Sequence, residues 1–167
     1  MHDRDDSSTI RPPQPTRLRD GVRILDIENY VPFLLNATSN AWQRRTSADY
    51  RARFGIGIVE WRVIAMLNIE PGITASRICE EIRMDKSAVS RTLAELDAKG
   101  HVTYDATGSD PRKRRWTLSP AGLDMHDAVL SAALEHEKTL MASVPPEDFI
   151  TFLNVMRRML ANVDPRD

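Results

Sequence analysis

The chain has 167 residues, a formal net charge of −1 and 41% hydrophobic residues, which fits one globular domain with an apolar core and excludes a disordered tail or a fibre. No run of about 18 apolar residues and no apolar segment behind a basic start is found, so the sequence predicts neither a membrane helix nor an export signal, and favours the cytoplasm. The single cysteine, Cys79, excludes an internal disulfide framework.

The first part of the chain combines an arm with a helix. Residues 1–20 mix charges, serines and prolines with almost no apolar residue, which is typical of a flexible arm. The following segment, NYVPFLLNATSNAWQRRTSADY, places Phe33 and Asn40 on one helical face, and Pro32 fixes the helix start nearby. FGIG then ends this helix.

The next segment, VEWRVIAMLNI, predicts a helix that is apolar on two sides. Two stripes share it, one of Val59, Val63, Met66 and Leu67, the other of Trp61, Ile64, Ala65 and Ile69. A helix with two apolar stripes is expected to be buried between two partners.

Four later helix starts share one signature, in which an apolar residue precedes the start and faces a second one in the first turns. The pairs are Ile73 with Ile78, Met84 with Val89, Leu118 with Leu123, and Val144 with Phe149. Pro120 and Pro146 fit the first helical position, and Gly100 fits a left-handed cap after the second of these helices.

The first two of these helices, residues 75–83 and 86–99, predict a helix-turn-helix. Val89, Leu93 and Leu96 form the inward stripe of the second helix. Its outward face carries small or basic residues, Lys86, Ser87, Ser90, Arg91 and Ala94, where a merely solvated helix more often carries long Glu and Lys side chains. Its 14 residues span about 21 Å, enough to lie in a DNA major groove about 12 Å wide.

A basic hairpin follows the second helix. SDPRKRRW, residues 109–116, holds four adjacent cations between two segments of period-2 alternation, HVTYD upstream and RWTL downstream, with turn residues in ATGSDP. The region from Lys86 to Arg115 has seven Lys or Arg against four Asp or Glu, an excess of three. The cations therefore lie at the tip and the returning edge of a projecting β-hairpin.

The last two helices indicate an oligomer. SPAGLDMHDAVLSAALEHEKTLM predicts a helix of about 22 residues, or about 33 Å. After it, Phe149, Phe152, Leu153, Met156, Met159, Leu160 and Val163 repeat at helical spacing with little chain left to cover them.

The order helix, helix, strand, basic hairpin, strand is that of a winged helix-turn-helix, and over residues 28–163 the chain resembles the MarR family of bacterial transcriptional regulators. The resemblance is carried by DKSAVSRTLAELDAKGHV and DPRKRRWTLSPAG. It implies that Arg112 enters the minor groove and that Asp110 steadies the wing by pairing with an arginine. Lys113 and Arg115 would then neutralise phosphates, with Arg114 nearer the hairpin body; a solvated strand edge is the alternative for Arg114 and Arg115.

The predicted DNA contacts are Thr74, Ser76, Lys86, Ser87, Ser90, Arg91, Asp110, Arg112, Lys113 and Arg115. Family members often release DNA when a phenolic or aromatic acid enters a cleft between their lobes. The resemblance therefore suggests a ligand site at Phe33, Asn40, Trp61 and Arg62, although Phe33 and Trp61 fit plain core positions as well, and Arg62 a surface ion pair.

No catalytic, metal-binding or cofactor-binding constellation is recognised. His2, His101, His126 and His136 lack the spacing of a ligand pair, and FGIG is far from a phosphate loop. Cys79 lies in a packed helical stripe, which favours a core residue over a redox sensor.

The sequence thus predicts a mainly α fold with a small β wing. Residues 1–20 would form a flexible arm, 21–58 the N-terminal helix of a dimerisation lobe, 59–118 the DNA-binding lobe, and 119–167 the C-terminal dimerisation helices. We expect a homodimeric repressor that binds a near-palindromic duplex operator and is released by a small anionic aromatic ligand. The alternative is a winged-helix module that binds protein, which a weak dependence of binding on salt would indicate.

Overall fold

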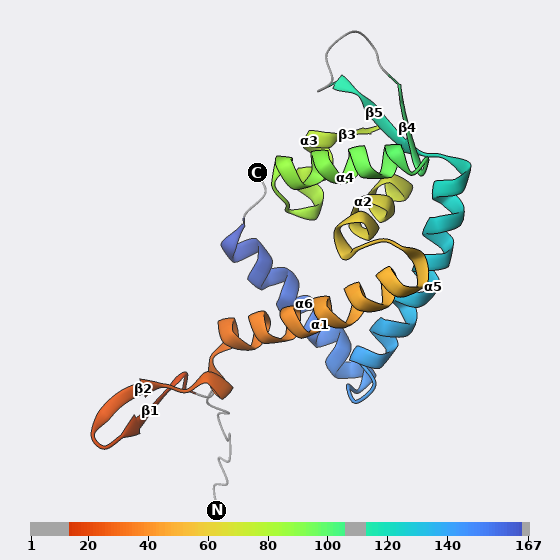
Figure 1. Ribbon diagram of the computed structural model, residues 1–167. Helices are drawn as coiled ribbons and strands as arrows, with labels where there is room; N and C mark the ends of the chain where they lie inside the picture. Colours follow the sequence, from red (N-terminus) through yellow and green to blue (C-terminus); the bar gives the residue numbers. More distant parts are fainter. Residues whose placement is uncertain (1–13, 106–112, 165–167) are drawn as a thin grey trace, which may run out of the picture. The chain divides into compact units, whose positions relative to one another are not determined.

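The computed structural model describes residues 14–105 and 113–164. Within them six α-helices and five strands follow the order β1–β2–α1–α2–β3–α3–α4–β4–β5–α5–α6 (Figure 1). The chain divides into two compact units, Met1–Ser47 and Ala48–Asp167. The length of the chain predicts a single domain, whereas the structure has two units. Among the described residues of the first unit, only Thr46 is buried.

The first unit contains a hairpin that the sequence did not lead us to expect. Strands β1 (Thr16–Arg19) and β2 (Val22–Leu25) pair in register, and a short 3-10 helix, Ile27–Asn29, follows them. Asp20 and Gly21, at the turn, have φ values of 52° and 79°. Two positive φ values define a type I′ turn, for which Asp-Gly is a preferred pair. Residue 20 is therefore the turn of a hairpin and not the end of an unstructured segment.

Helix α1 (Val31–Phe54) begins beside Pro32 and ends where FGIG was predicted to break the pattern. Gly55 has a φ of 68°. Helix α2 (Ile58–Ile69) then buries Val63, Ile64, Met66 and Leu67. The expectation of two buried sides is met in part: Val59, Trp61 and Ala65 are half-buried, and Ile69 is 75% exposed at the helix end.

The helix-turn-helix forms as the sequence predicts. Helix α3 (Ala75–Ile82) is capped by Thr74, and helix α4 (Lys86–Ala98) by Asp85, whose side chain accepts a hydrogen bond from the Ala88 amide. Arg83, between the helices, is in the left-handed region with a φ of 54°. Gly100 adopts a φ of 74° just beyond α4. Capping and turn residues thus set both helix boundaries.

A three-stranded antiparallel sheet adjoins these helices, in the order β3–β5–β4. Strands β4 (Val102–Asp105) and β5 (Arg115–Leu118) match the predicted hairpin, with Tyr104 opposite Trp116. Strand β3 (Ile73–Thr74) pairs with β5 and was not predicted, because two residues are too short to show a period. We call β4, β5 and the connection between them the wing.

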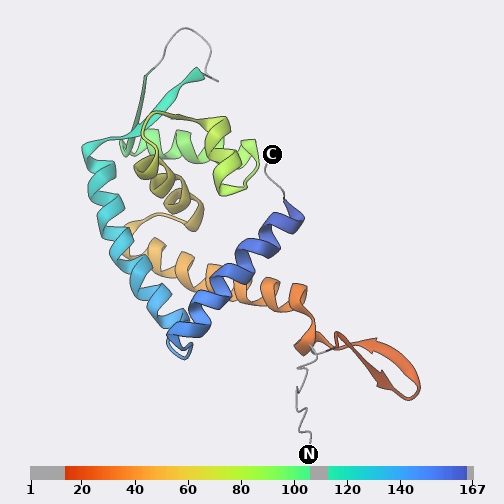
Figure 2. The ribbon, with the colours of Figure 1, turned by 180° about the vertical axis from the view of Figure 1, so that it is seen from behind.

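Helices α5 (Pro120–Leu140) and α6 (Pro146–Val163) complete the second unit, with prolines at the predicted first positions. Seen from behind, α5 leads away from the wing and α6 turns back from its far end (Figure 2). The apolar core of this unit joins α2, α3, α4, β4, β5 and α5 around Val63, Ile64, Leu67, Ile78, Val89, Leu93, Leu96, Val102, Trp116 and Val129. Among the described helices, none has the length and apolar character needed to cross a membrane.

Candidate nucleic-acid interface

Helix α4 has one buried and one open face. Val89, Leu93 and Leu96 are at most 2% exposed and anchor the helix in the core. The residues that directly follow these three in the sequence, Ser90, Ala94 and Asp97, are exposed. Lys86, Ser87 and Arg91 are exposed as well. The rigid core therefore holds a stripe of short side chains and two cations toward solvent, as the sequence predicts.

The first turn of α4 is preorganised by Asp85. Its Oδ1 accepts hydrogen bonds from the Ser87 hydroxyl at 2.6 Å and the Ala88 amide at 2.9 Å. The hydrogen bond from Ser87, followed by that from Ala88, lowers the pKa of Asp85 below its ordinary value. The proton of the Ser87 hydroxyl is thus engaged within the cap, and its oxygen remains an acceptor on the exposed face.

Arg91 extends from the middle of this exposed face. Its Nε donates to the carbonyl oxygen of Ser87 at 3.3 Å, one turn earlier in the helix. No ion pair within residues 14–105 and 113–164 involves Arg91 or Lys86. Two cations without an acidic partner in this part of the chain are suited to bind anions such as phosphates.

Arg77, on the preceding helix α3, is in the opposite situation. Its guanidinium lies 2.7 Å from Glu81 and 3.8 Å from both Glu70 and Glu80. Ser76 beside it is exposed, whereas the Thr74 hydroxyl accepts the Arg77 amide at 3.3 Å as the helix cap. Of the two contacts predicted here, Ser76 has a free surface and Thr74 already has a structural role.

The body of the wing is held by aromatic side chains. Trp116 is 6% exposed, and its ring centroid lies 4.8 Å from that of Tyr104 on the neighbouring strand. The guanidinium of Arg114 lies over the Tyr104 ring, 4.2 Å from its centroid. Arg114 therefore belongs to the hairpin body, and the cation–π contact identifies a role for it other than a solvated strand edge.

The remaining cations of the wing are placed differently. Lys113 is exposed, and Arg115 donates from Nη1 to the Gly72 carbonyl oxygen at 3.3 Å, which ties β5 to the start of β3. Asp110 and Arg112, the predicted wing-tip pair, lie outside the described residues.

A hollow of about 210 Å³ joins the open face of α4 to the wing. It is lined by Ala75, Ser90, Leu93, Ala94, Asp97, Arg114 and Trp116. The open face of α4 and the body of the wing therefore share one concave surface. The sequence did not reveal this hollow, because it joins helix and strand residues that are about 20 positions apart.

The four predicted ligand residues belong to different units. Phe33 and Asn40 are exposed in the first unit. Trp61 and Arg62 are half-buried in the second, where the Trp61 ring centroid lies 6.3 Å from that of Tyr50 and 5.6 Å from that of His126. Trp61 thus packs on the core, and the common ligand site stays a prediction.

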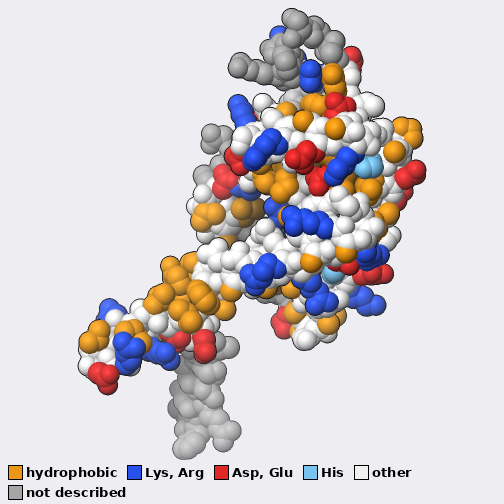
Figure 3. Space-filling view, in the orientation of Figure 1, with side chains coloured by type: hydrophobic (Ala, Val, Ile, Leu, Met, Phe, Trp, Pro, Cys, Tyr) orange, Lys and Arg blue, Asp and Glu red, His pale blue; other side chains and the backbone are white. Residues whose placement is uncertain are grey.

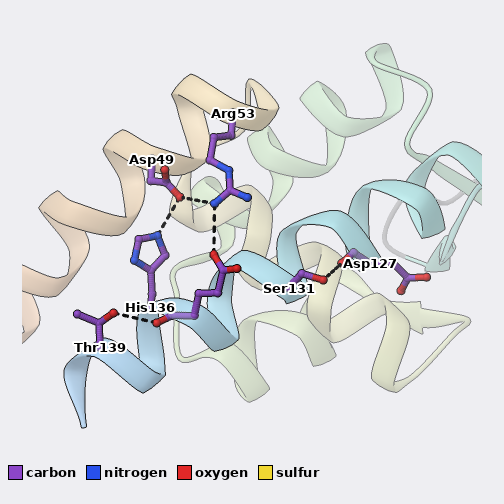
Figure 4. A network of polar contacts seen from close by, with 7 residues as sticks. Asp49, Arg53, Asp127, Ser131, His136 and Thr139 are labelled. Atoms are coloured by element: carbon purple, nitrogen blue, oxygen red, sulfur yellow. Dashed lines mark hydrogen bonds and ion pairs between the residues drawn. The ribbon is translucent and has the colours of Figure 1, made fainter. Parts of the chain in front are cut away.

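A polar network that the sequence did not indicate joins the end of α1 to α5 (Figure 4). His136 Nε2 donates to Asp49 Oδ2 at 2.9 Å, and Arg53 Nη1 lies 3.2 Å from the same oxygen and 3.8 Å from Glu135 Oε2. The hydrogen bond from His136 is the main reason why the pKa of Asp49 is lowered. The network pairs residues 87 positions apart, so no local motif could have revealed it.

No group of three or more His, Cys, Asp and Glu side chains in residues 14–105 and 113–164 is arranged to hold a metal ion. Cys79 is half-buried and packs against the core, and this burial raises the pKa of its thiol. A raised pKa reduces the thiolate fraction, which is the reactive form.

A family model described as "MarR family" matches residues 54–115. This segment contains α2, the helix-turn-helix and most of the wing. No curated protein matches the sequence. Among solved structures, a MarR/EmrR family transcriptional regulator from Acinetobacter sp. ADP1 is similar with a TM-score of 0.77 and 25% identity, over 85% of this chain and 100% of that one.

Two more distant structures share the fold. MepR of S. aureus, solved as a DNA complex, has a TM-score of 0.72 at 19% identity, over 82% of this chain and 99% of that one. MarR of Staphylococcus aureus, solved with salicylate and kanamycin, has a TM-score of 0.71 at 16% identity, over 80% and 91% of the two chains.

The matched segment contains the exposed cations of α4 and every lining residue of the shared hollow except Trp116. The similarity to the Acinetobacter regulator extends beyond this segment to 85% of the chain. On this evidence residues 54–115 match the MarR family model, and the chain has the winged helix-turn-helix fold of MarR-family transcriptional regulators.

Proposed function

We propose that the protein is a homodimeric DNA-binding repressor that reads a near-palindromic operator and is released by a small anionic aromatic ligand. The observation that carries this proposal is the open face of α4, where Lys86 and Arg91 accompany short side chains above a rigid core. Short side chains let a helix approach base edges closely, and arginine and lysine are the common partners of guanine in the major groove.

The wing supplies the second half of the proposed interface. Arg114 stiffens the hairpin body through Tyr104, so Lys113 projects from an ordered support. Phosphate contacts from Lys113, together with the minor-groove contact that the family resemblance assigns to Arg112, would orient α4 on the duplex. The MepR structure, a DNA complex of the same fold, supports this use of the architecture.

The homodimer is supported by the apolar surface of the last helix. In α6, Ile150, Phe152, Val155, Leu160 and Val163 are between 44% and 80% exposed. Exposed apolar side chains gathered on one helix favour a protein–protein contact. A two-fold dimer would present two copies of α4 to half-sites about 34 to 36 Å apart.

The proposed effector rests on the family resemblance and on the salicylate complex of the S. aureus MarR structure. Arg62, half-buried in α2, is the cation that we assign to the carboxylate of such a ligand. Salicylate is therefore the probe of choice: it should raise the melting temperature of the wild type and release bound DNA, and Arg62→Ala should weaken both effects. The exposed Arg51 offers a matched control in Arg51→Ala.

The experiment that tests DNA binding is selection of duplexes from a random pool, followed by footprinting. The proposal predicts that the selected duplexes share a near-palindrome and that the protein protects two half-sites one helical turn apart on one face of the DNA. Absence of any enriched sequence, with no protected region, would contradict it. Repression is then tested with a reporter placed behind the selected operator.

A further inference from the structure

The hairpin β1–β2 exposes apolar side chains that need a cover. Leu18 is 73% and Val22 62% exposed, and Leu25 and Ile27 follow at 48% each. Within the described residues its two strands form a separate sheet and pair only with each other. Because an isolated two-stranded hairpin is at best marginally stable in water, we expect this hairpin to dock on another surface.

The hairpin is also basic. Between Thr16 and Leu25 it carries Arg17, Arg19 and Arg23 against Asp20, a net charge of +2 from three bases and one acid. The register places Arg23 opposite Leu18 and Arg19 opposite Val22, so both faces combine a cation with an apolar side chain. Figure 3 shows apolar side chains beside arginines on this hairpin. A fitting partner surface would be both apolar and acidic.

The chain offers such a surface where α5 ends and α6 begins. We name residues 134–152 the α5–α6 surface. Its exposed apolar residues are Leu134, Leu140, Val144, Ile150 and Phe152. Its charged residues are Glu135, Glu137, Glu147 and Asp148 against Lys138, a net charge of −3 from four acids and one base. Both properties of the hairpin therefore have a complement on this surface.

We propose that the hairpin of one subunit docks on the α5–α6 surface of a second copy of the chain, an inference that rests on the proposed homodimer. Two-fold symmetry would then create this contact twice, once for each subunit. Duplex DNA would neutralise the three arginines but would leave Leu18 and Val22 in water, so a protein surface fits the hairpin better. The hairpin would thus hold the two subunits together, and we call this contact the interlock.

Cross-linking between two differently tagged, co-expressed chains tests the contact. Cys79, the single cysteine of the sequence, is first replaced by serine. One chain then carries Leu18→Cys and the other Ile150→Cys, and a short bis-maleimide is added. The matched control pairs Leu18→Cys with Ile69→Cys, because Ile69 is as exposed as Leu18 but lies at the end of α2.

The proposal predicts a two-chain product that carries both tags for Leu18→Cys with Ile150→Cys, and several-fold less product for the control pair. If light scattering shows a dimer but this product does not exceed the control, the hairpin docks elsewhere: the interlock is wrong and the homodimer stands. If light scattering shows a monomer, both proposals fail. A third variant carries Leu18→Cys and Ile150→Cys in the same chain. If its cross-link forms only within that chain, the hairpin covers its own subunit and the interlock is wrong.

Charge reversal tests whether the three arginines of the hairpin bind the partner chain or DNA. Changing Arg17, Arg19 and Arg23 together to glutamate should raise the dissociation constant of the dimer at least several-fold. Adding Glu147→Lys and Asp148→Lys in the same chain should restore it toward the wild-type value, because each hairpin again meets opposite charge. A reversal that leaves the dimer unchanged while weakening DNA binding would instead assign the hairpin to DNA and overturn the interlock.

Discussion

Arg91 is the residue whose side chain we expect to carry most sequence information. Its Nε is held by the Ser87 carbonyl oxygen, which leaves the two terminal nitrogens for a ligand. Two parallel hydrogen bonds from one guanidinium to one guanine are worth about 1 to 3 kcal/mol of discrimination. Arg91→Ala should therefore weaken operator binding by about that amount and reduce the preference for operator over random DNA, as measured by fluorescence anisotropy on both duplexes.

Arg77→Ala is the matched control for this prediction. Arg77 lies on the neighbouring helix, but three glutamates surround its guanidinium. The control variant should bind the operator with nearly unchanged affinity. An equal loss of affinity for operator and random duplex in Arg91→Ala would show a phosphate contact instead of a base contact, and no loss at all would remove α4 from the interface.

Gly122 is required by close packing at the start of α5. A Cβ at this position would overlap the backbone carbonyl of His101, which also accepts the Ser119 amide at 3.0 Å. Backbone cannot move aside as a side chain tip can, so Gly122→Ala should lower the free energy of unfolding by about 1 to 3 kcal/mol. Urea denaturation measures the loss.

Ala128→Ser, at an exposed position of the same helix, is the control and should change the free energy of unfolding by less than about 0.5 kcal/mol. A Gly122→Ala variant as stable as this control would show that the junction of wing and helix relaxes without cost.

At the scale of the elements, the sequence predicted those that carry their own local signals. Thr74, Asp85 and Ser119 are the observed side-chain caps, and Pro145 and Pro146 begin α6 as expected. Caps act within three residues, so sequence alone can reveal them. The hairpin at Asp20–Gly21 was missed although Asp-Gly is a local turn signal and arginines alternate with apolar residues on both sides of it, because the charges and prolines of residues 1–20 favoured a flexible arm.

The candidate site shows the same division. The exposed residues of α4 follow from helical periodicity, because every buried position fixes the direction of its neighbours. The engagement of Arg115 with Gly72, 43 residues away, and the stacking of Arg114 on Tyr104 depend on strand pairing, which sequence does not specify at the level of single contacts. Hydrogen bonds between distant residues therefore had to come from the structure.

The contact between α1 and α5 makes stability depend on pH. Folding lowers the pKa of Asp49, chiefly through the hydrogen bond from His136. A carboxyl with a lowered folded pKa contributes stability above its unfolded value near 3.8, and this contribution is lost as the pH falls through the folded value. Asp49→Asn should thus be less stable than the wild type at about pH 7, and the difference should shrink toward about pH 3.

Thermal unfolding over this pH range measures the effect. Asp124→Asn, which removes an exposed carboxylate from α5, should follow the wild type throughout. A difference between Asp49→Asn and the wild type that stays constant with pH would show that the ionised Asp49 does not favour the folded state.

At the scale of the whole molecule, the exposed apolar face of α6 makes a lone subunit incomplete. Phe152 and Val155 are 47% and 45% exposed. Changing both to aspartate should convert the dimer to monomer or unfolded chain at low micromolar concentration, and deletion of residues 145–167 should leave an insoluble or unfolded chain. Light scattering and sedimentation report the mass, and circular dichroism reports the fold.

Ile69→Asp introduces a single aspartate at a more exposed apolar position and should leave the mass unchanged. A Phe152→Asp and Val155→Asp variant that is a well-folded monomer and still binds a palindromic operator tightly would be incompatible with the proposed architecture.

The central claim, that this protein acts by binding the phosphate backbone and bases of duplex DNA, is tested most directly by the salt dependence of operator binding. Lysine and arginine that neutralise phosphates release counterions, so the logarithm of the association constant should fall linearly with the logarithm of the salt concentration. With roughly six to ten phosphate contacts for a dimer, affinity should drop by about 10³- to 10⁵-fold between about 50 and 200 mM salt. An affinity that stays flat over this range, or no binding to any selected duplex, would contradict the account.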